Sequence, residues 1–299
     1  MVTRRTHDRR FFLVPRAPGV AARFQYVLAV AAERYGILLH NYFCGSNHYH
    51  VLLTDVLGQL PDFTQLLNSL LARATNADLG RADALFDCRP VNWVEQLDVD
   101  ACIDTSAYIA ANPVEFGGVA HGHEWPGARS RPADIGGPGR LIRRPVDFHG
   151  PDSVLPEVVL LRLFPPPMVV PDRGERYRHD VEKATAELEY GHRRARQSKG
   201  LGFLGREACR QVSPDHRPGD IEERGPGTAP LPVKCRDSRT REDRIEQIRE
   251  FRSAYAESRG AWEGGRHDVT FPRGTWLVVV RHGARAGARG AVRLRDPSA

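Results

Sequence analysis

Hydrophobic and polar residues alternate along the first 115 residues with two different periods. Apolar positions recur every three or four residues in two segments, which predicts amphipathic helices over 18–36 and 60–80, each ending at a glycine. Shorter apolar segments bounded by Gly, Pro or Asn are typical of strands, and the chain has four of them: 9–16, 37–45, 48–55 and 90–97. Gly45-Ser46-Asn47 separates the second strand from the third, which indicates a hairpin.

A third helix is predicted over residues 99–112. Asp98 can cap its first turn, and Pro113 is expected to bring it to a close. The predicted order is therefore strand, helix, strand, strand, helix, strand, helix. An α+β fold accommodates that order as one antiparallel sheet with helices packed on it, the ferredoxin-like arrangement.

The pattern weakens beyond residue 130. Residues 131–240 are rich in Pro, Gly and Arg and contain one long periodic segment, 180–197, so we expect long loops or partial disorder there. Residues 240–262 predict a helix with an apolar stripe, and 268–283 predict a short strand or a buried turn and helix. We therefore predict three parts: a folded domain over 1–130, an irregular and partly disordered extension over 131–240, and a small helical C-terminal region over 241–299.

Composition is that of a soluble globular protein, with 41% hydrophobic and 27% charged residues in 299. No apolar run approaches the roughly 18–20 residues of a membrane span, and the Arg-rich start lacks the apolar segment of a secretory signal. The expected compartment is the cytoplasm, with no membrane partner. Five scattered cysteines without a Cys-x-x-Cys pair indicate neither a disulfide framework nor a zinc ribbon, so we predict reduced and mostly structural thiols.

The formal net charge of +6 arises after residue 125, because acidic residues outnumber arginines before it. Four arginines nevertheless cluster near the start, Arg4, Arg5, Arg9 and Arg10. Such a distribution is compatible with a polyanion such as DNA, since guanidinium groups pair well with phosphate. Only three of the 43 basic residues are lysines, a bias that the base composition of the coding DNA would explain equally well.

Two histidines lie one residue apart in the third predicted strand. The strand period of two places His48 and His50 on one face. Tyr108 and Asn112 are four residues apart, so they share one face of the third helix. If that helix packs across the sheet face with the histidines, His48, His50 and the Asn112 carbonyl oxygen can surround a divalent cation beside the Tyr108 phenol. That arrangement suits phosphoryl chemistry, although each residue alone is more typical of a structural role.

Two stretches resemble a known family. "SNHYHVLLTD" (46–55) resembles the His-hydrophobic-His motif of the HUH single-strand nucleases. "AYIAANPVEFGGVAHGHEWPGARS" (107–130) resembles the tyrosine helix and following segment of the REP-associated tyrosine transposases, relatives of the insertion-sequence-200-like transposases. The resemblance covers residues 9–130, and its second stretch matches the family in this order: Tyr108, Asn112, Pro113, Val114, Gly117, Val119, Trp125, Pro126 and Ser130.

The resemblance implies the HUH nuclease fold and a transposase that cuts and rejoins single-stranded DNA, with a hairpin in its target. Tyr108 would be the nucleophile that forms a 5′-phosphotyrosine link, and His48, His50 and Asn112 would hold Mg²⁺ or Mn²⁺. Imidazole-rich ligation in isolation would equally suit Zn²⁺.

The sequence departs from the family pattern at three places. Gly45-Ser46 stand where Met-Pro is usual, and Tyr49 stands where an aliphatic residue is usual. Tyr49 is expected to pack into the opposite face of the sheet. Glu115 replaces a usual Arg, which predicts the loss of one phosphate contact.

Several interpretations remain open from the sequence. The chain could be a mobile transposase, a domesticated nuclease acting on repeated hairpin elements of its host chromosome, or a catalytically silent DNA-binding protein. A relaxase or replication initiator fits less well, because those relatives tend to carry a lysine beside the tyrosine. Monomer and homodimer are both open, as is whether the C-terminal region binds DNA. Candidate DNA contacts are Arg4, Arg5, Arg9, Arg10 and Trp125, whereas surface positions are expected for His40, His121 and His123.

Overall fold

The computed structural model describes residues 1–16, 19–89, 91–145, 153–219 and 232–287. The chain divides into two compact units, Met1–Arg236 and Asp237–Ala299. The described residues of 131–236 belong to the same unit as the first 130, and the division falls close to the predicted boundary between 240 and 241. The expected disorder within 131–240 falls in part on residues 146–152 and 220–231, which lie outside the described residues.

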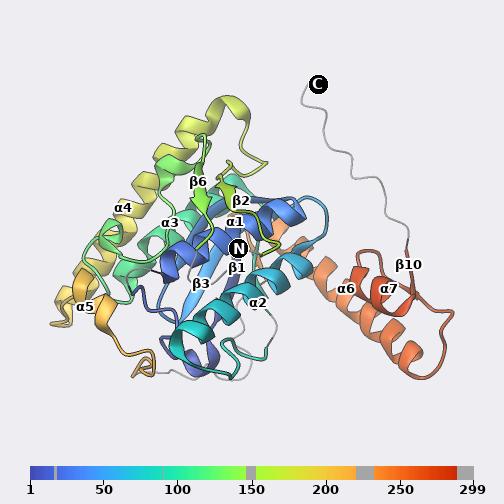
Figure 1. The fold of residues 1–299 in the computed structure, drawn as a ribbon. Helices are drawn as coiled ribbons and strands as arrows, with labels where there is room; N and C mark the ends of the chain where they lie inside the picture. Colours follow the sequence, from blue (N-terminus) through green and yellow to red (C-terminus); the bar gives the residue numbers. More distant parts are fainter. Residues whose placement is uncertain (17–18, 90, 146–152, 220–231, 288–299) are drawn as a thin grey trace. The chain divides into compact units, whose positions relative to one another are not determined.

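A four-stranded antiparallel sheet lies at the centre of the first unit, so the predicted mixed α+β class is confirmed (Figure 1). Its order is β2-β3-β1-β4. β2 (Ile37–Cys44) and β3 (His48–Asp55) form the predicted hairpin, with Tyr42 opposite Val51. β4 (Asn92–Trp93) is the short outer strand beyond β1.

The first strand is not the predicted one. β1 is Val2–Arg5, and residues 9–16 form no strand although Phe12, Leu13 and Val14 are buried. The strand was not predicted because half of its residues are arginines, Arg4 and Arg5. Arg4 is accommodated because its guanidinium donates to the backbone carbonyl oxygens of Asp87 and Arg89 and lies over the Phe86 ring, which lets a charged residue occupy an inner strand.

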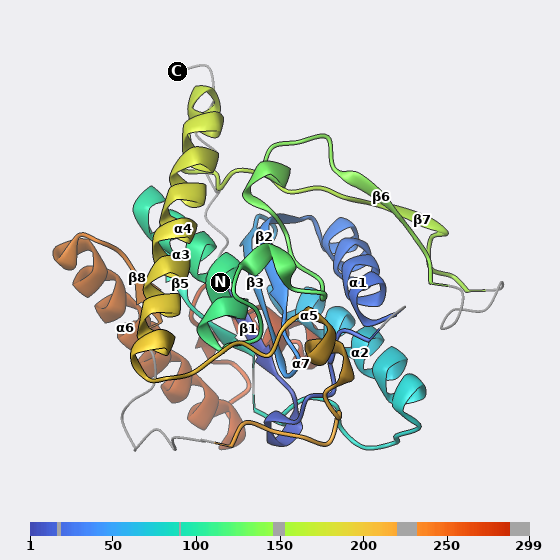
Figure 2. The same cartoon turned by 90° about the vertical axis from the view of Figure 1, so that its left-hand side faces the viewer.

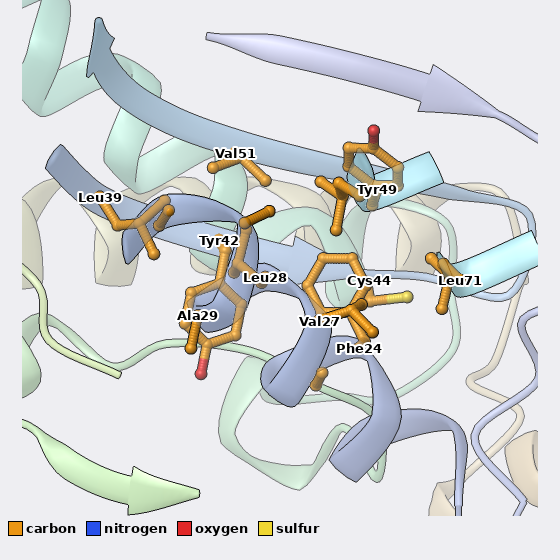
Figure 3. Packing of buried hydrophobic residues seen from close by; sticks show 14 of the residues in the cluster. Phe24, Val27, Leu28, Ala29, Leu39, Tyr42, Cys44, Tyr49, Val51 and Leu71 are labelled. Atoms are coloured by element: carbon orange, nitrogen blue, oxygen red, sulfur yellow. The ribbon is translucent and has the colours of Figure 1, made fainter. Parts of the chain in front are cut away.

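Two helices, α1 (Val20–Tyr35) and α2 (Leu60–Leu79), cover one face of the sheet. Both end as predicted, at Gly36 and Gly80, whose φ of 62° is the left-handed conformation that glycine adopts without strain. Figure 3 shows how Phe24 and Val27 of α1 pack against Tyr49 on β3. Tyr49 is fully buried, and its hydroxyl donates to Asn68 Oδ1 at 2.8 Å, so its predicted position is confirmed.

The third helix, α3 (Val99–Glu115), packs on the opposite face of the sheet (Figure 2). The Asp98 side chain caps it by accepting a hydrogen bond from the Ala101 backbone N–H, as predicted. The helix continues through Pro113 to Glu115, three residues beyond the predicted end. A proline this close to a helix end removes only one backbone hydrogen bond, and the Phe116 N–H still donates to the Asn112 carbonyl at 3.3 Å.

A long helix, α4 (Gly174–Ser198), packs along α3 in the same direction (Figure 2). Tyr177 near its start contacts Ser106 (O–O distance 3.1 Å), and Glu189 further along accepts from the Gly122 N–H at 2.9 Å. The described residues of the first unit also form β5 (Glu95–Gln96), β6 (Arg140–Arg143), β7 (Val158–Leu161), α5 (Arg206–Gln211), β8 (Val233–Lys234) and short 3₁₀ helices at His7–Arg9, Gly122–Glu124, Pro132–Asp134 and Pro171–Arg173.

The second unit consists of α6 (Ser238–Glu263), β9 (Thr270–Phe271), α7 (Trp276–His282) and β10 (Arg285–Ala286). The predicted helix over 240–262 is therefore confirmed, and 268–283 holds both a short strand and a helix. Phe271 is buried against Tyr255 and Trp262 of α6.

Across the described ranges, none of the helices combines the length and the apolarity that crossing a bilayer requires. No disulfide joins any of the five cysteines, all of which lie in the described ranges, and four of them are buried.

Candidate functional site

The structure brings the four site residues predicted from the sequence together between β3 and α3. The His48 and His50 rings lie 4.8 Å apart, and the His50 and Tyr108 rings lie 5.4 Å apart. His48 Nε2 lies 3.1 Å from Asn112 Oδ1. His50 and Asn112 are buried, whereas His48 and Tyr108 are half-buried, so the cluster lies at the edge of the core with access to solvent.

Hydrogen bonds fix the orientation of two amides around His48. Asn47 Nδ2 donates to the Arg9 carbonyl at 3.0 Å, which turns Asn47 Oδ1 toward His48 Nδ1 at 2.8 Å. Asn112 Nδ2 donates to Glu115 Oε2 at 3.2 Å, which turns Asn112 Oδ1 toward His48 Nε2. His48 therefore faces an acceptor oxygen at each ring nitrogen.

A neutral imidazole cannot satisfy both oxygens, because it carries one N–H and one lone pair. Burial lowers the pKa of His48 to about 4, with a smaller contribution from the nearby Arg5 charge, so the ring is neutral near pH 7. If the proton is on Nδ1, where the contact is shorter, the Nε2 lone pair faces the Asn112 Oδ1 lone pair. Two facing acceptors at this distance are unfavourable unless a cation binds them.

His50 is oriented from the neighbouring strand. Thr3 of β1 lies directly opposite His50 in the antiparallel pair, and its Oγ1 lies 2.8 Å from His50 Nδ1. This contact leaves Nε2 as the ring nitrogen available to a ligand, an arrangement typical of metal-binding histidines. Burial is the main cause that lowers the pKa of His50 well below its ordinary 6.5, with a smaller contribution from the Arg5 charge, so His50 is also neutral near pH 7.

Among the described residues, no three His, Cys, Asp or Glu side chains gather in a way that could hold a metal ion. The candidate centre therefore depends on the Asn112 amide oxygen as its third ligand. With His48 protonated on Nδ1, His48, His50 and Asn112 fit a divalent cation, because their donor atoms then include the facing acceptor pair and carry no charge that would offset that of the ion.

The predicted arginines lie in different environments. Arg5 lies directly opposite His48 in the β1–β3 pair, so its exposed side chain projects from the face of the sheet that carries the histidines. Arg4 projects from the other face, where the hydrogen bonds described above hold its guanidinium. Arg10 forms an ion pair with Asp215 at 3.5 Å, and Arg9 is half-buried, with its backbone in the left-handed region (φ 54°). Of these four arginines, Arg5 thus lies on the same face of the sheet as the histidine pair.

Trp125 is buried, with 4% of its surface exposed. It packs against Phe43 and Phe116, at ring-centroid distances of 5.7 and 5.4 Å, and its Nε1–H donates to the Cys44 carbonyl at 3.0 Å. Because so little of the Trp125 side chain is exposed, its burial does not favour the predicted contact with DNA. Trp125 instead anchors the segment after α3 to the end of β2, beside the hairpin tip.

Ser130 anchors the same segment further along. Its Oγ donates to Asn41 Oδ1 and accepts from the Tyr42 N–H at 2.9 Å, and Asn41 Nδ2 in turn donates to the Ser106 carbonyl of α3 at 3.2 Å. These buried hydrogen bonds connect β2 with α3.

Gly45 has a specific packing role at the hairpin tip. A Cβ placed there would lie 3.0 Å from Phe43 Cε1 and 3.3 Å from His48 Cε1. Both distances are tighter than most Cβ contacts, so a side chain at position 45 would press on the His48 ring.

The prediction of a surface position for His40 is wrong. Only 1% of it is exposed, and its ring nitrogens contact the Phe164 carbonyl and Thr54 Oγ1, both at 2.8 Å. Burial lowers its pKa to about 4. We refer to His40, His48 and His50 as the hairpin histidines. His121 and His123 lie outside the site, and their rings stack on each other at 5.5 Å.

Sequence reasoning missed the residues that orient the site: Thr3, Asn47 and Glu115. Glu115 lies three residues after Asn112, a spacing that places both on one helix face and could have indicated their contact. Thr3 could not have been found, because its strand was predicted elsewhere.

No protein-family model matches the chain, and searches of the curated proteins and of the solved structures found no match.

Proposed function

We propose that this chain is a metal-dependent single-strand DNA endonuclease and strand transferase, similar to the REP-associated tyrosine transposases, with Tyr108 as its nucleophile. One observation carries the proposal: two pairs of residues far apart in the sequence form one cluster, in which His48 Nε2 and Asn112 Oδ1 face each other at 3.1 Å beside the Tyr108 ring.

The strand order supports the same proposal. The order β2-β3-β1-β4, with α1 and α2 on one face, agrees with a ferredoxin-like arrangement. In the HUH nucleases that the sequence resembles, this sheet carries the histidine pair and a helix supplies the tyrosine. Here β3 carries His48 and His50, and α3 carries Tyr108 on the remaining face.

The chemistry assigned to Tyr108 is a transesterification. The phenol oxygen attacks a backbone phosphate of single-stranded DNA, a bond forms from phosphorus to this oxygen, and the bond from phosphorus to the 3′ oxygen breaks. The phenol proton ends on the released 3′-OH, so the step needs no oxidant and no nucleotide. The 5′-phosphotyrosine retains an ester bond, which allows a second 3′-OH to attack it and rejoin strands.

The surrounding residues prepare the site for a polyanion. Arg5 projects from the histidine-bearing face, where its guanidinium can pair with a phosphate oxygen. The neutral state of His48 and His50 makes their lone pairs available near pH 7 with no proton to displace. When bound by His48, His50 and Asn112, Mg²⁺ or Mn²⁺ would supply Lewis-acid polarisation of the phosphate.

The test is the formation of a covalent adduct with labelled single-stranded oligonucleotides taken from the DNA that flanks the gene. With Mg²⁺ or Mn²⁺ the protein is expected to yield a protein–DNA adduct that survives denaturation, and EDTA or Tyr108→Phe is expected to abolish it. Tyr190→Phe, which removes an exposed phenol on α4, is the matched control and should retain the adduct.

Two results would contradict the proposal. An adduct that persists in Tyr108→Phe would place the nucleophile elsewhere. Tight binding of the oligonucleotides without any adduct would favour the catalytically silent DNA-binding protein.

A further inference from the structure

A cavity of about 320 Å³ lies beside His48. Four parts of the chain line it: Phe11 near the N-terminus, the tip of the β2–β3 hairpin, the residues that follow α3, and several residues of the segment 204–218, which includes α5. Its volume lies at the lower end of the range of about 300–1,000 Å³ found for small-ligand sites. The space therefore suits one planar group of the size of a nucleobase and excludes a duplex.

The lining of this cavity is mainly apolar and aromatic. Phe11, Phe116 and Trp125 contribute rings, and Leu204 contributes an aliphatic side chain. Phe116 exposes 45% of its surface and Leu204 exposes 54%, although both are large apolar residues. Exposed apolar side chains that meet in a concave surface are typical of binding sites.

Hydrogen bonds hold the cavity wall in place. The Leu204 and Gly205 N–H groups donate to the carbonyl oxygens of Gly117 and Gly118, at 3.0 and 2.8 Å. Cys209 Sγ donates to the same Gly118 carbonyl at 3.2 Å. Hydrogen bonds thus attach the segment 204–218 to the residues that follow α3, and this segment forms one wall of the cavity.

Many of the polar groups along the wall already have partners within the protein. The Gly117 and Gly118 carbonyls accept the hydrogen bonds just described, and both ends of the Asn47 amide are used, by His48 and by the Arg9 carbonyl. An occupant is therefore held by contact with rings and apolar side chains more than by hydrogen bonds to its edges.

Two guanidinium groups lie near the cavity. Arg5 is opposite His48 in the sheet, and Arg196 of α4 lies so close to Gly117 that a Cβ there would be 2.2 Å from its Cζ. The cavity thus combines an aromatic interior with positive charge near its wall. A planar base attached to a phosphate has the complementary chemistry.

We propose that this cavity binds one unpaired base of single-stranded DNA, on the nucleotide that adjoins the phosphate attacked by Tyr108. This inference rests on the proposed function, and it identifies where a base next to the cleaved bond is held. Phe116 is the main stacking partner, since it is the aromatic ring of the cavity with the largest exposed fraction. Recognition by stacking tolerates different bases, so the cavity fixes position more than sequence.

The experiment measures binding in the Tyr108→Phe background, where cleavage is blocked. Short single-stranded oligonucleotides from the flanking DNA are compared with versions that carry one abasic site, moved along the strand, by fluorescence anisotropy. We expect one position at which loss of the base weakens binding roughly 5- to 150-fold, the range for one base stacked on an aromatic side chain. In Phe116→Ala that penalty is expected to disappear, because the stacking partner is absent.

Two further variants make the result specific. Phe116→Leu retains apolar packing without an aromatic ring and should lose most of the penalty while its melting temperature stays close to that of wild type. Tyr190→Ala, which removes an exposed aromatic residue from α4, should retain the full penalty. A flat abasic scan, or a penalty that Phe116→Ala and Phe116→Leu leave unchanged, would overturn the inference.

The adduct assay keeps the two proposals apart. If wild type forms the adduct while the abasic scan is flat, the base-binding inference fails and the proposed function stands. If no adduct forms while the Phe116-dependent penalty is present, the cavity binds a base and the proposed chemistry fails.

Discussion

Glu115→Ala is expected to weaken the binding of Mn²⁺ without destabilising the fold. In the wild type, Glu115 Oε2 accepts from Asn112 Nδ2 at 3.2 Å, which presents Asn112 Oδ1 to the site. Without this acceptor the amide can turn over and donate its N–H to the lone pair of His48 Nε2. The turned amide would satisfy His48 but would present a donor to the metal, so the third ligand would be lost.

The size of the effect follows from these contacts. Loss of a residue that orients a metal ligand weakens metal affinity by about 10- to 100-fold, which corresponds to about 1.4–2.8 kcal/mol. Glu115 is exposed, and solvent weakens its hydrogen bond, so we expect a value near the lower end, about tenfold. Glu115→Gln retains an acceptor for Asn112 Nδ2, but its own N–H can also donate to the Asn112 oxygen of the turned amide. Its loss of Mn²⁺ affinity should therefore be intermediate.

Isothermal titration with Mn²⁺ would measure the affinity, and thermal melting of the metal-free proteins would measure stability. Glu187→Ala removes an exposed carboxylate from α4 and controls for the loss of one negative charge. Equal Mn²⁺ affinity in wild type and Glu115→Ala would refute the role assigned to Glu115. An equal loss of Mn²⁺ affinity in Glu187→Ala would show that the overall charge of the protein, and not the contact with Asn112, causes the effect.

Three other predictions concern the site and its support. Gly45→Ala should displace the His48 ring and weaken Mn²⁺ binding in the same titration, whereas Gly191→Ala, in open space on α4, should not; equal affinities would contradict the packing argument. Ser130→Ala leaves the buried Asn41 Oδ1 without its donor and should lower the free energy of unfolding by about 1–3 kcal/mol in urea titrations, so an unchanged midpoint would argue against this contact. The hairpin histidines have folded pKa values below their ordinary 6.5, so their contribution to stability is fully present above that pH and is lost as the pH falls through the folded pKa, which is about 4 for His40 and His48 and is also well below 6.5 for His50. Each should lower the free energy of unfolding by up to about 1.4 kcal/mol per pH unit in that window, and equal stability at pH 7 and pH 5 would contradict their burial as neutral rings.

Elements with a clear period and a clear stop were predictable from the sequence. The helices over 20–35 and 60–79 show a helical repeat and end at a glycine, and the hairpin has a Gly-Ser-Asn turn between its strands. β1 was missed because the arginine in its interior is stabilised by carbonyls more than 80 residues away, which no local pattern reveals. A local rule predicted that α3 would end before Pro113. The helix instead continues to Glu115, because its last turn tolerates the loss of the one hydrogen bond that the proline nitrogen cannot donate.

The candidate site was predictable only in part, for a related reason. Periods of two and four residues place His48 with His50 and Tyr108 with Asn112, and these pairs depend on local geometry alone. The orientation of the side chains depends on tertiary contacts, such as Thr3 with His50, which the sequence does not reveal. The cavity beside His48 likewise includes the segment 204–218, for which the sequence predicted long loops or partial disorder.

The most direct test of the account is to identify the residue that becomes bonded to DNA. The adduct would be digested with a protease and a nuclease, and the remaining nucleotide located by mass spectrometry of the peptides. The account predicts a nucleotide joined through its 5′ phosphate to the peptide that contains Tyr108. A nucleotide on any other residue would contradict Tyr108 as the nucleophile, and a 3′ phosphate link would contradict the proposed direction of cleavage.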